Sequence, residues 1–192
     1  IYFVGIGGIG MSALARYFHA THKSVSGYDK TPSDNTKALE NIGIKVSFRD
    51  DIQVVDSMFL DNTTTLVVFT PAVPQTNSIL AYFNAQNFTV LKRSDVLGII
   101  TKDTFCLAIA GTHGKTTTSS IVAHLLQKNN RGGVSFLGGI CTNYNSNILL
   151  QEGQNAVVEA DEYDRSFLHL HPSAIILTSM DPDHLDIYGD EA

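Results

Sequence analysis

The chain has 192 residues, of which 43% are hydrophobic and 17% are charged. This composition supplies enough apolar side chains to fill the core of one or two domains, and it excludes a disordered or highly charged chain. The formal net charge of −6 excludes a generally basic nucleic-acid-binding surface, and no apolar run approaches the roughly 18 residues of a membrane span.

Short apolar stretches alternate with stretches of helical composition along the chain. Strands are predicted at residues 1–6, 24–28, 66–69, 88–91, 105–110, 156–158 and 174–177. Helices are predicted at residues 11–18, 36–41, 77–86, 95–100 and 116–127, with a flexible break at residues 129–133. This alternation favours parallel, doubly wound α/β sheets. We expect a first domain at residues 1–100 and a second at residues 101–192.

A glycine-rich turn follows the first predicted strand and opens the first predicted helix. Its glycines are Gly5, Gly7 and Gly10, with Gly8 between them. This spacing leaves room for a tight turn and lets the backbone approach a pyrophosphate at a helix N-terminus. Asp29 ends the next strand, where a carboxylate commonly binds a ribose hydroxyl. The pattern predicts a nucleotide site, with NAD as the default ligand. The alternative is a turn that only packs helix against strand.

A second glycine-rich turn joins an apolar strand to the longest predicted helix. Its residues are Gly111, Thr112, His113, Gly114, Lys115, Thr116 and Thr117. Backbone N–H groups of such a loop cradle phosphates, the lysine reaches the β/γ oxygens, and the hydroxyl that follows ligates Mg²⁺. Ile109 stands where the general pattern has its first glycine, so this phosphate loop is a shorter variant. The alternative is an ordinary strand–turn–helix with an exposed lysine.

Acidic side chains follow the last two predicted strands. Glu159, Asp161 and Glu162 come after the first of these strands, and the second is followed by Asp181, Asp183, His184 and Asp186. Oxygen ligands suit Mg²⁺, and one imidazole is an unusual addition to them. Any one of these acids is more simply explained as a solvated side chain. As a set behind two strands of a phosphate-loop domain, they favour a metal site.

These constellations, in this order, resemble the Mur ligase family of peptidoglycan synthesis. The resembling segments are GIGGIGMSALA at residues 5–15, GTHGKTTT at 111–118, Gly138-Gly139, EADEYDRSFL at 159–168 and DPDHLDIYG at 181–189. GTHGKTTT and the DHxD segment are the specific ones. The resemblance implies a Rossmann-like domain that binds a UDP-sugar, followed by part of a phosphate-loop ATPase domain. It also implies that the family's amino-acid-binding domain lies outside these residues.

The resemblance further implies an ATP-dependent, ADP-forming ligase. In such a ligase ATP phosphorylates the carboxylate of UDP-N-acetylmuramate, and the amine of L-alanine then attacks the acyl phosphate. It implies catalytic roles for Lys115 at the β/γ-phosphates, for Thr116 and Glu159 at one Mg²⁺, and for His184 at a second. Residues 111–117 would bind ATP, and the first glycine turn with Asp29 would bind the UDP-sugar instead of NAD. His113 and residues 142–147 would lie near the muramoyl group.

Three alternatives stay open. A ligase of the same family that attaches a recovered tripeptide differs mainly in the amino-acid domain. An NAD-dependent oxidoreductase leaves the phosphate loop and the acidic strand ends unexplained. The third is a nucleotide-binding module without chemistry. Because the chain begins at Ile1 and ends just after a motif, we expect a fragment that forms no amide bond alone. Cys106 and Cys141 supply no disulfide framework, which fits a cytoplasmic protein.

Overall fold

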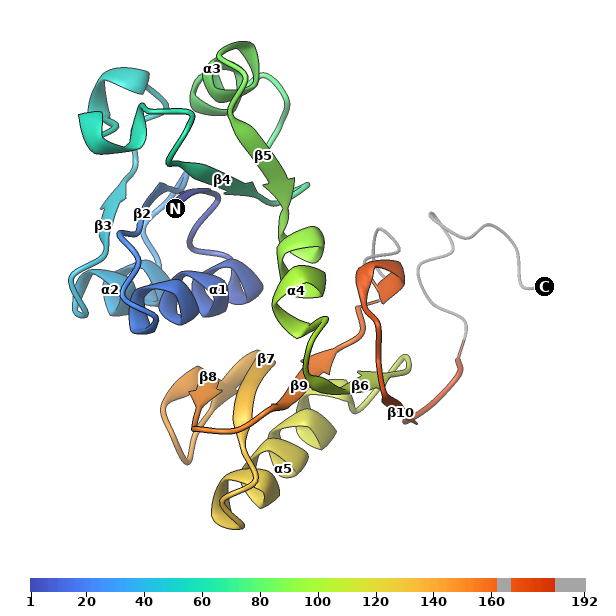
Figure 1. Cartoon of the computed structure of the whole chain (residues 1–192). Helices are drawn as coiled ribbons and strands as arrows, with labels where there is room; N and C mark the ends of the chain where they lie inside the picture. The colour runs from blue at the N-terminus through green and yellow to red at the C-terminus, as the bar shows by residue number, and fades with distance from the viewer. Residues whose placement is uncertain (162–166, 182–192) are drawn as a thin grey trace. The chain divides into compact units, whose positions relative to one another are not determined.

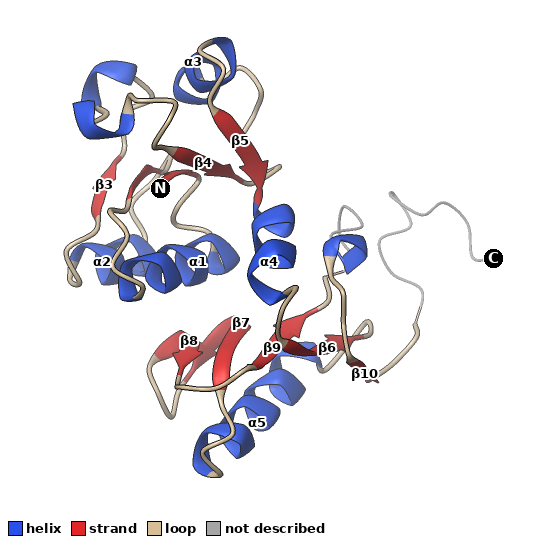
Figure 2. Ribbon diagram, in the orientation of Figure 1, coloured by secondary structure: helices blue, strands red, loops and turns tan. Residues whose placement is uncertain are grey.

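The computed structural model describes residues 1–161 and 167–181 (Figure 1). The chain divides into two compact units, Ile1–Val96 and Leu97–Ala192. Each unit has strands and helices in alternation (Figure 2), which confirms the α/β fold class. Among the described residues, no helix has the length and apolar character needed to cross a membrane.

The first unit is built on a five-stranded parallel sheet with the order β3-β2-β1-β4-β5. Its strands are β1 (Tyr2–Val4), β2 (Ser26–Tyr28), β3 (Lys45–Ser47), β4 (Leu66–Phe69) and β5 (Thr89–Lys92). Its helices are α1 (Ile9–Ala20), α2 (Asp34–Glu40) and α3 (Ser78–Ala85), with short 3-10 turns at Ile52–Val54 and Ser57–Phe59. The order of the strands reverses beside β1, and ligands of open α/β sheets bind at such a reversal.

Alternating side chains of β1 explain how the first sheet buries both faces. Tyr2 and Val4 point to one face and pack in a cluster with Phe59 and Phe83, whereas Phe3 points to the opposite face and contacts Phe18 of α1. All three β1 side chains are almost fully buried. Since strand side chains alternate with a period of two, a run of three large apolar residues predicts a strand covered on both sides.

The second unit has a five-stranded sheet with the order β10-β6-β9-β7-β8. Its strands are β6 (Phe105–Ala110), β7 (Gly133–Cys141), β8 (Ser146–Leu150), β9 (Asn155–Glu159) and β10 (Ala174–Leu177). Among the described strands of this sheet, only β8 runs antiparallel to its neighbour. Helix α5 (Lys115–Lys128) packs against β6, β7 and β9. Helix α4 (Arg93–Thr101) follows β5 directly and ends in this unit.

The break expected at residues 129–133 is present between α5 and β7, and its flexibility stays a prediction. This segment is a short connection from α5 into β7, and its backbone is hydrogen-bonded. Arg131 N–H donates to the carbonyl of Leu126 at 2.9 Å, and Gly132 N–H donates to the side chain of Gln151 at 3.0 Å. The glycines at this point let neighbouring backbones approach closely, and the chain then forms the β7–β8 hairpin, which the sequence did not predict.

Gly98 provides a test of how α4 is held in the second unit. A Cβ atom on Gly98 would lie 2.3 Å from the carbonyl oxygen of His169. Alanine favours a helix over glycine by about 1 kcal/mol. Overpacking costs about 1–3 kcal/mol, and a clash with a backbone carbonyl takes the upper part of that range, about 2–3 kcal/mol. We therefore expect Gly98→Ala to lower the free energy of unfolding by about 1–2 kcal/mol in urea titrations.

Ile99→Ala is the matched control, because Ile99 is the next residue of α4 and its side chain is 63% exposed. Its loss should change the free energy of unfolding little. A Gly98→Ala protein as stable as the wild type would contradict the packing of α4 on the turn at residues 167–169.

Candidate functional site

The phosphate loop lies between the end of β6 and the start of α5. Gly111 and Gly114 both have positive φ angles, of 122° and 82°, which L side chains rarely adopt. A Cβ atom on Gly111 would also lie 2.4 Å from the hydroxyl oxygen of Thr178. Both glycines are therefore required by the local backbone. The loop ends at the N-terminus of α5, where backbone N–H groups have no partner within the helix.

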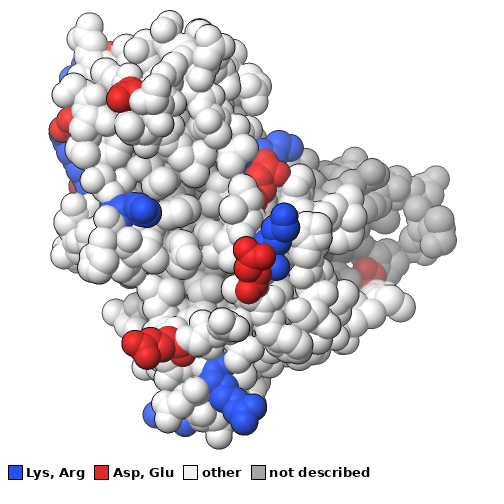
Figure 3. Space-filling view, viewed as in Figure 1, with Lys and Arg blue, Asp and Glu red and all other residues white. Residues whose placement is uncertain are grey.

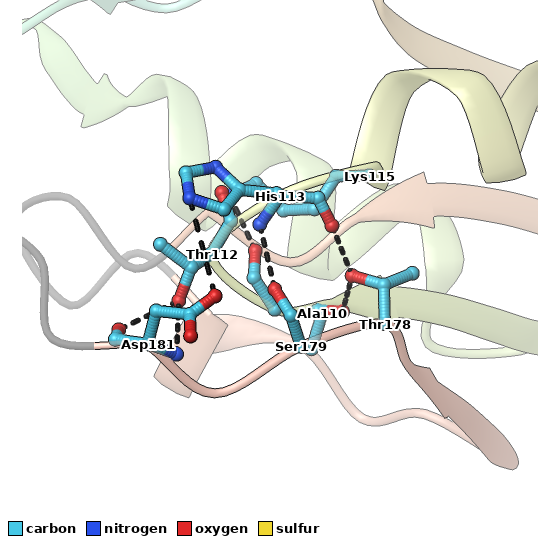
Figure 4. A network of polar contacts seen from close by, with 8 residues as sticks. Ala110, Thr112, His113, Lys115, Thr178, Ser179 and Asp181 are labelled. Carbon is cyan, nitrogen blue, oxygen red and sulfur yellow. Dashed lines mark hydrogen bonds and ion pairs between the residues drawn. The ribbon is translucent and has the colours of Figure 1, made fainter.

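The residues that follow β10 hold this loop from one side (Figure 4). The Thr112 hydroxyl donates to the carbonyl of Asp181 at 2.7 Å and accepts from the N–H of the same residue at 3.0 Å. Ser179 accepts from His113 N–H at 2.9 Å, and Thr178 donates to the His113 carbonyl. The His113 ring lies 3.9 Å from the Asp181 carboxylate. Sequence reasoning missed this contact between the two segments.

Lys115 is folded over the loop that precedes it. Its ammonium group donates to the carbonyl of Gly111 at 2.6 Å and lies 3.4 Å from that of Thr112. The lysine is half-buried, at the first position of α5. Its positive charge therefore lies at the loop and the helix N-terminus, both of which favour a bound anion.

Glu159 ends β9 and lies beside the phosphate loop because β9 pairs in parallel with β6, with Glu159 opposite Ile109. One carboxylate oxygen, Oε2, accepts from the Thr116 hydroxyl at 3.0 Å. The other, Oε1, accepts from the Ser119 hydroxyl and from Gly138 N–H, both at 2.7 Å. The structure thus brings the predicted pair Thr116 and Glu159 together. Ser119 was not predicted, because its burial against Glu159 is visible only in the structure.

Of the remaining predicted residues of this site, Asp161 follows β9 and is half-buried, and its carbonyl accepts from Phe167 N–H at 3.1 Å. Thr117 is exposed in the first turn of α5. His184 lies outside the described residues, as do Glu162, Asp183 and Asp186. Within residues 1–161 and 167–181, no three side chains of the His, Cys, Asp and Glu types gather as they would around a metal ion.

The first glycine turn borders a separate cavity of about 580 Å³ in the first unit. Gly7 N–H donates to Asp29 Oδ2 at 2.7 Å, and the Gly7 carbonyl accepts from the Asn35 side chain at 2.9 Å. Gly5 has a φ of 88°, and Gly8 caps α1. All of these except Asn35 line the cavity. The Asp29 carboxylate therefore already holds the turn and is only partly free for a ligand.

Gly10 and Tyr28 differ in their position relative to this cavity. Gly10 lies inside α1 and is not among the residues that line the cavity, because it packs against the Arg93 side chain. Tyr28 lines the cavity, and burial raises the pKa of its phenol, with smaller contributions from Asp50 and Asp29. The phenol thus stays neutral and able to donate a hydrogen bond.

Two family models cover the two halves of the chain. Residues 1–104 match the Mur ligase family catalytic domain, and residues 109–192 match the Mur ligase middle domain. The chain belongs to the Mur ligase family. This membership favours the ligase interpretations of the two glycine turns over an NAD-dependent oxidoreductase.

Two relatives of this Mur ligase chain share one name. It is 58% identical over 193 residues to a UDP-N-acetylmuramate–L-alanine ligase of Flavobacterium psychrophilum and 54% identical over 190 residues to one of Porphyromonas gingivalis. These alignments cover 100% and 98% of the chain, but 43% and 42% of the relatives. The chain thus spans about two fifths of their length.

Solved structures of the family have the same fold. A UDP-N-acetylmuramate-alanine ligase from Thermotoga maritima has a TM-score of 0.88 at 30% identity, over 99% of this chain and 43% of that one. A UDP-N-acetylmuramate:L-alanyl-gamma-D-glutamyl-meso-diaminopimelate ligase from Neisseria meningitides has a TM-score of 0.87 at 26% identity. This match covers 98% of this chain and 63% of that one. The neighbours confirm a Rossmann-like sheet followed by a phosphate-loop sheet.

The contact between the loop and the residues after β10 yields a direct test. Thr112→Val removes the hydroxyl that both donates to and accepts from the Asp181 backbone. A single hydrogen bond contributes about 0.5–1.5 kcal/mol net, so we expect the Asp181 amide to exchange roughly 2- to 10-fold faster with solvent deuterium. NMR-detected hydrogen exchange measures this rate.

Thr118→Val is the control for this experiment, because it makes the same change within α5. It should leave the Asp181 amide unaffected. Equal exchange rates in the wild type and Thr112→Val would show that Thr112 does not hold the segment after β10.

Proposed function

We propose that the chain forms the UDP-sugar-binding and ATP-binding parts of an ATP-dependent ligase that joins L-alanine to UDP-N-acetylmuramate. The observation that carries the proposal is the contact of Glu159 with Thr116, directly after Lys115 in the phosphate loop. The contact pairs a carboxylate with a hydroxyl, and the preceding residue carries an ammonium group. We propose that these three groups bind the phosphates of ATP and a metal ion. The 58% identity to a relative with this name supports the choice of L-alanine.

We propose that residues 111–117 bind ATP and that Lys115 contacts its β/γ-phosphates. Lysine charge at this point neutralises the negative charge that moves during phosphoryl transfer. Phosphoryl transfer to the muramoyl carboxylate breaks the β–γ bridge and releases ADP. The amine of L-alanine then attacks the acyl carbon, loses a proton and expels phosphate, which forms the amide.

We propose Thr116 and Glu159 as ligands of one Mg²⁺, which would supply further neutralising charge at the phosphates. The donor set fits, because both side chains offer oxygen atoms. Their oxygens are 3.0 Å apart, and adjacent ligands of an octahedral Mg²⁺ are about 2.9 Å apart. We further propose that His184 contributes to a second Mg²⁺, with Glu159 near both.

We propose that the cavity of the first unit receives the UDP-sugar, through Gly5, Gly7, Gly8 and Asp29, with Gly10 placing α1 behind the turn. The position of the cavity at the reversal of strand order supports this assignment. A reaction that consumes ATP and a nucleotide sugar fits the cytoplasm, where we place the protein. Both cysteines are free thiols, in accord with that location.

The second candidate is a ligase that attaches a peptide in place of L-alanine. The Neisseria structure supports it, because its name describes a peptide and its fold matches at a TM-score of 0.87. Comparing L-alanine with the tripeptide as acceptors separates the two candidates.

A chimera tests the function. The chain replaces the matching 43% of the Flavobacterium psychrophilum relative, and amide product and phosphate are measured with ATP, Mg²⁺, UDP-N-acetylmuramate and either acceptor. We expect product with L-alanine and a loss of roughly 100- to 1,000-fold in Lys115→Ala, since one charge that stabilises the transition state is removed.

Lys128→Ala, at the exposed end of the same helix, is the control and should keep full activity. The unextended 192-residue chain should form no amide. Full activity of Lys115→Ala would refute the proposed role of the phosphate loop, and product with the tripeptide alone would favour the second candidate.

Gly7→Val tests the UDP-sugar assignment. A Cβ atom on Gly7 would lie 2.8 Å from the Thr36 methyl group and 2.9 Å from Asp29 Oδ2. Valine should distort the turn and weaken UDP-N-acetylmuramate binding roughly 10-fold or more, while ATP binding to the second unit stays unchanged. Calorimetry with each ligand measures both affinities. NAD binding by the wild type without UDP-sugar binding would favour an oxidoreductase instead.

A further inference from the structure

Ser119 is fully buried in α5, which is an unusual place for a serine hydroxyl. It lies three residues after Thr116, so the two side chains share one face of the helix. Burying a hydroxyl costs free energy unless it is hydrogen-bonded. Ser119 Oγ lies 2.7 Å from Glu159 Oε1 and 3.1 Å from the Thr116 carbonyl. The shorter contact is the one to the charged group, which is the stronger acceptor.

Gly138 of β7 holds the same carboxylate oxygen. Its N–H donates to Glu159 Oε1 at 2.7 Å. A Cβ atom at this position would lie 2.3 Å from Glu159 Oε2, so β7 approaches the carboxylate as closely as it does only because this residue is glycine. Oε1 therefore receives two donors from two different elements, α5 and β7.

The result is a carboxylate with two unlike oxygens. Oε1 accepts hydrogen bonds from Ser119 and Gly138, whereas Oε2 accepts one from the Thr116 hydroxyl. A cation beside Thr116 can then be ligated by Oε2 alone. Mg²⁺ requires near-octahedral geometry at about 2.0–2.1 Å, whereas Ca²⁺ takes 6–8 oxygens and often both oxygens of one carboxylate.

We propose that Ser119 is a positioning residue that restricts Glu159 to one-oxygen ligation and thereby makes the site select Mg²⁺ over Ca²⁺. Ser119 does not touch the cation; it acts through Glu159, with Gly138 N–H as its partner. This inference rests on the proposed Mg²⁺ site at Thr116 and Glu159. It adds the identity of the groups that set the preference of that site for one ion.

The test measures ADP affinity of the 192-residue chain by calorimetry in Mg²⁺, in Ca²⁺ and in EDTA. In the wild type we expect Mg²⁺ to strengthen ADP binding more than Ca²⁺ does. In Ser119→Ala the gain from Mg²⁺ should fall by about 10- to 100-fold, as for other groups that orient a metal ligand. The gain from Ca²⁺ should fall less, and the affinity in EDTA should stay unchanged.

Three controls separate positioning from a general structural role. Ser120→Ala makes the same change at the next, half-buried residue of α5 and should behave as the wild type. Ser119→Thr keeps the hydroxyl and should restore the preference for Mg²⁺. Thermal unfolding of each variant reports whether the fold is kept.

The outcomes distinguish a failure of the proposed metal site from a failure of the role of Ser119. A wild type whose ADP affinity is the same in Mg²⁺ and in EDTA would overturn the proposed metal site itself. A wild type that responds to Mg²⁺, with the same ratio of Mg²⁺ and Ca²⁺ effects in Ser119→Ala, would overturn only the role of Ser119. Equal loss of ADP affinity in all three solutions would reduce Ser119 to a packing residue.

Discussion

The carboxylate of Glu159 is the point on which the second unit depends. It receives hydrogen bonds from the first turn of α5, from the second turn of α5 and from β7. Without it, the Gly138 N–H would lose its acceptor, and the buried Ser119 hydroxyl would keep only the longer contact with the Thr116 carbonyl at 3.1 Å. The same charge therefore fixes the helix on the sheet and shapes the site. The Glu159 carboxylate is therefore already oriented in the absence of a ligand.

The first unit repeats this arrangement with different residues. Asp29 directly follows β2, the neighbour of β1, and accepts from Gly7 in the glycine turn that follows β1. Glu159 ends β9, the neighbour of β6, and accepts from the helix that follows the phosphate loop. In the first unit a carboxylate beside the adjacent parallel strand holds the glycine-rich turn itself, whereas in the second unit it holds the helix that the turn opens. Parallel pairing brings this about, because the carboxyl ends of neighbouring strands meet at one edge of the sheet.

Sequence reasoning succeeded where an element carries its own signal. The strands Leu66–Phe69, Phe105–Ala110 and Ala174–Leu177 were predicted with the bounds that the structure has, because each is a short, mostly apolar run between polar turns. Strand β3 (Lys45–Ser47) was missed because three residues with two polar side chains show no pattern. Strand β7 was missed because its glycines, read as loop signals, serve the close approach to Glu159.

The residues of the candidate site also divide into those that a sequence signal marks and those that none marks. Lys115, Thr116 and Glu159 were predicted because a motif or a strand end marks each of them. Ser119 and the contact of Thr112 with Asp181 were not, since no local spacing records which segments meet across the sheet. Contacts between residues far apart in sequence become visible only once the strand order is known.

Charge explains why such local contacts matter for this chain. Its net charge is −6, and acidic and basic side chains are interspersed on the face in Figure 3, so no broad positive field attracts an anionic nucleotide there. Distant charges are screened beyond about 8 Å at physiological ionic strength, whereas partners at 3–4 Å still interact strongly. Binding of a polyphosphate must therefore come from groups in direct contact. In the proposed ATP site of the second unit these would be the loop N–H groups, the Lys115 ammonium group and the cation proposed at Glu159.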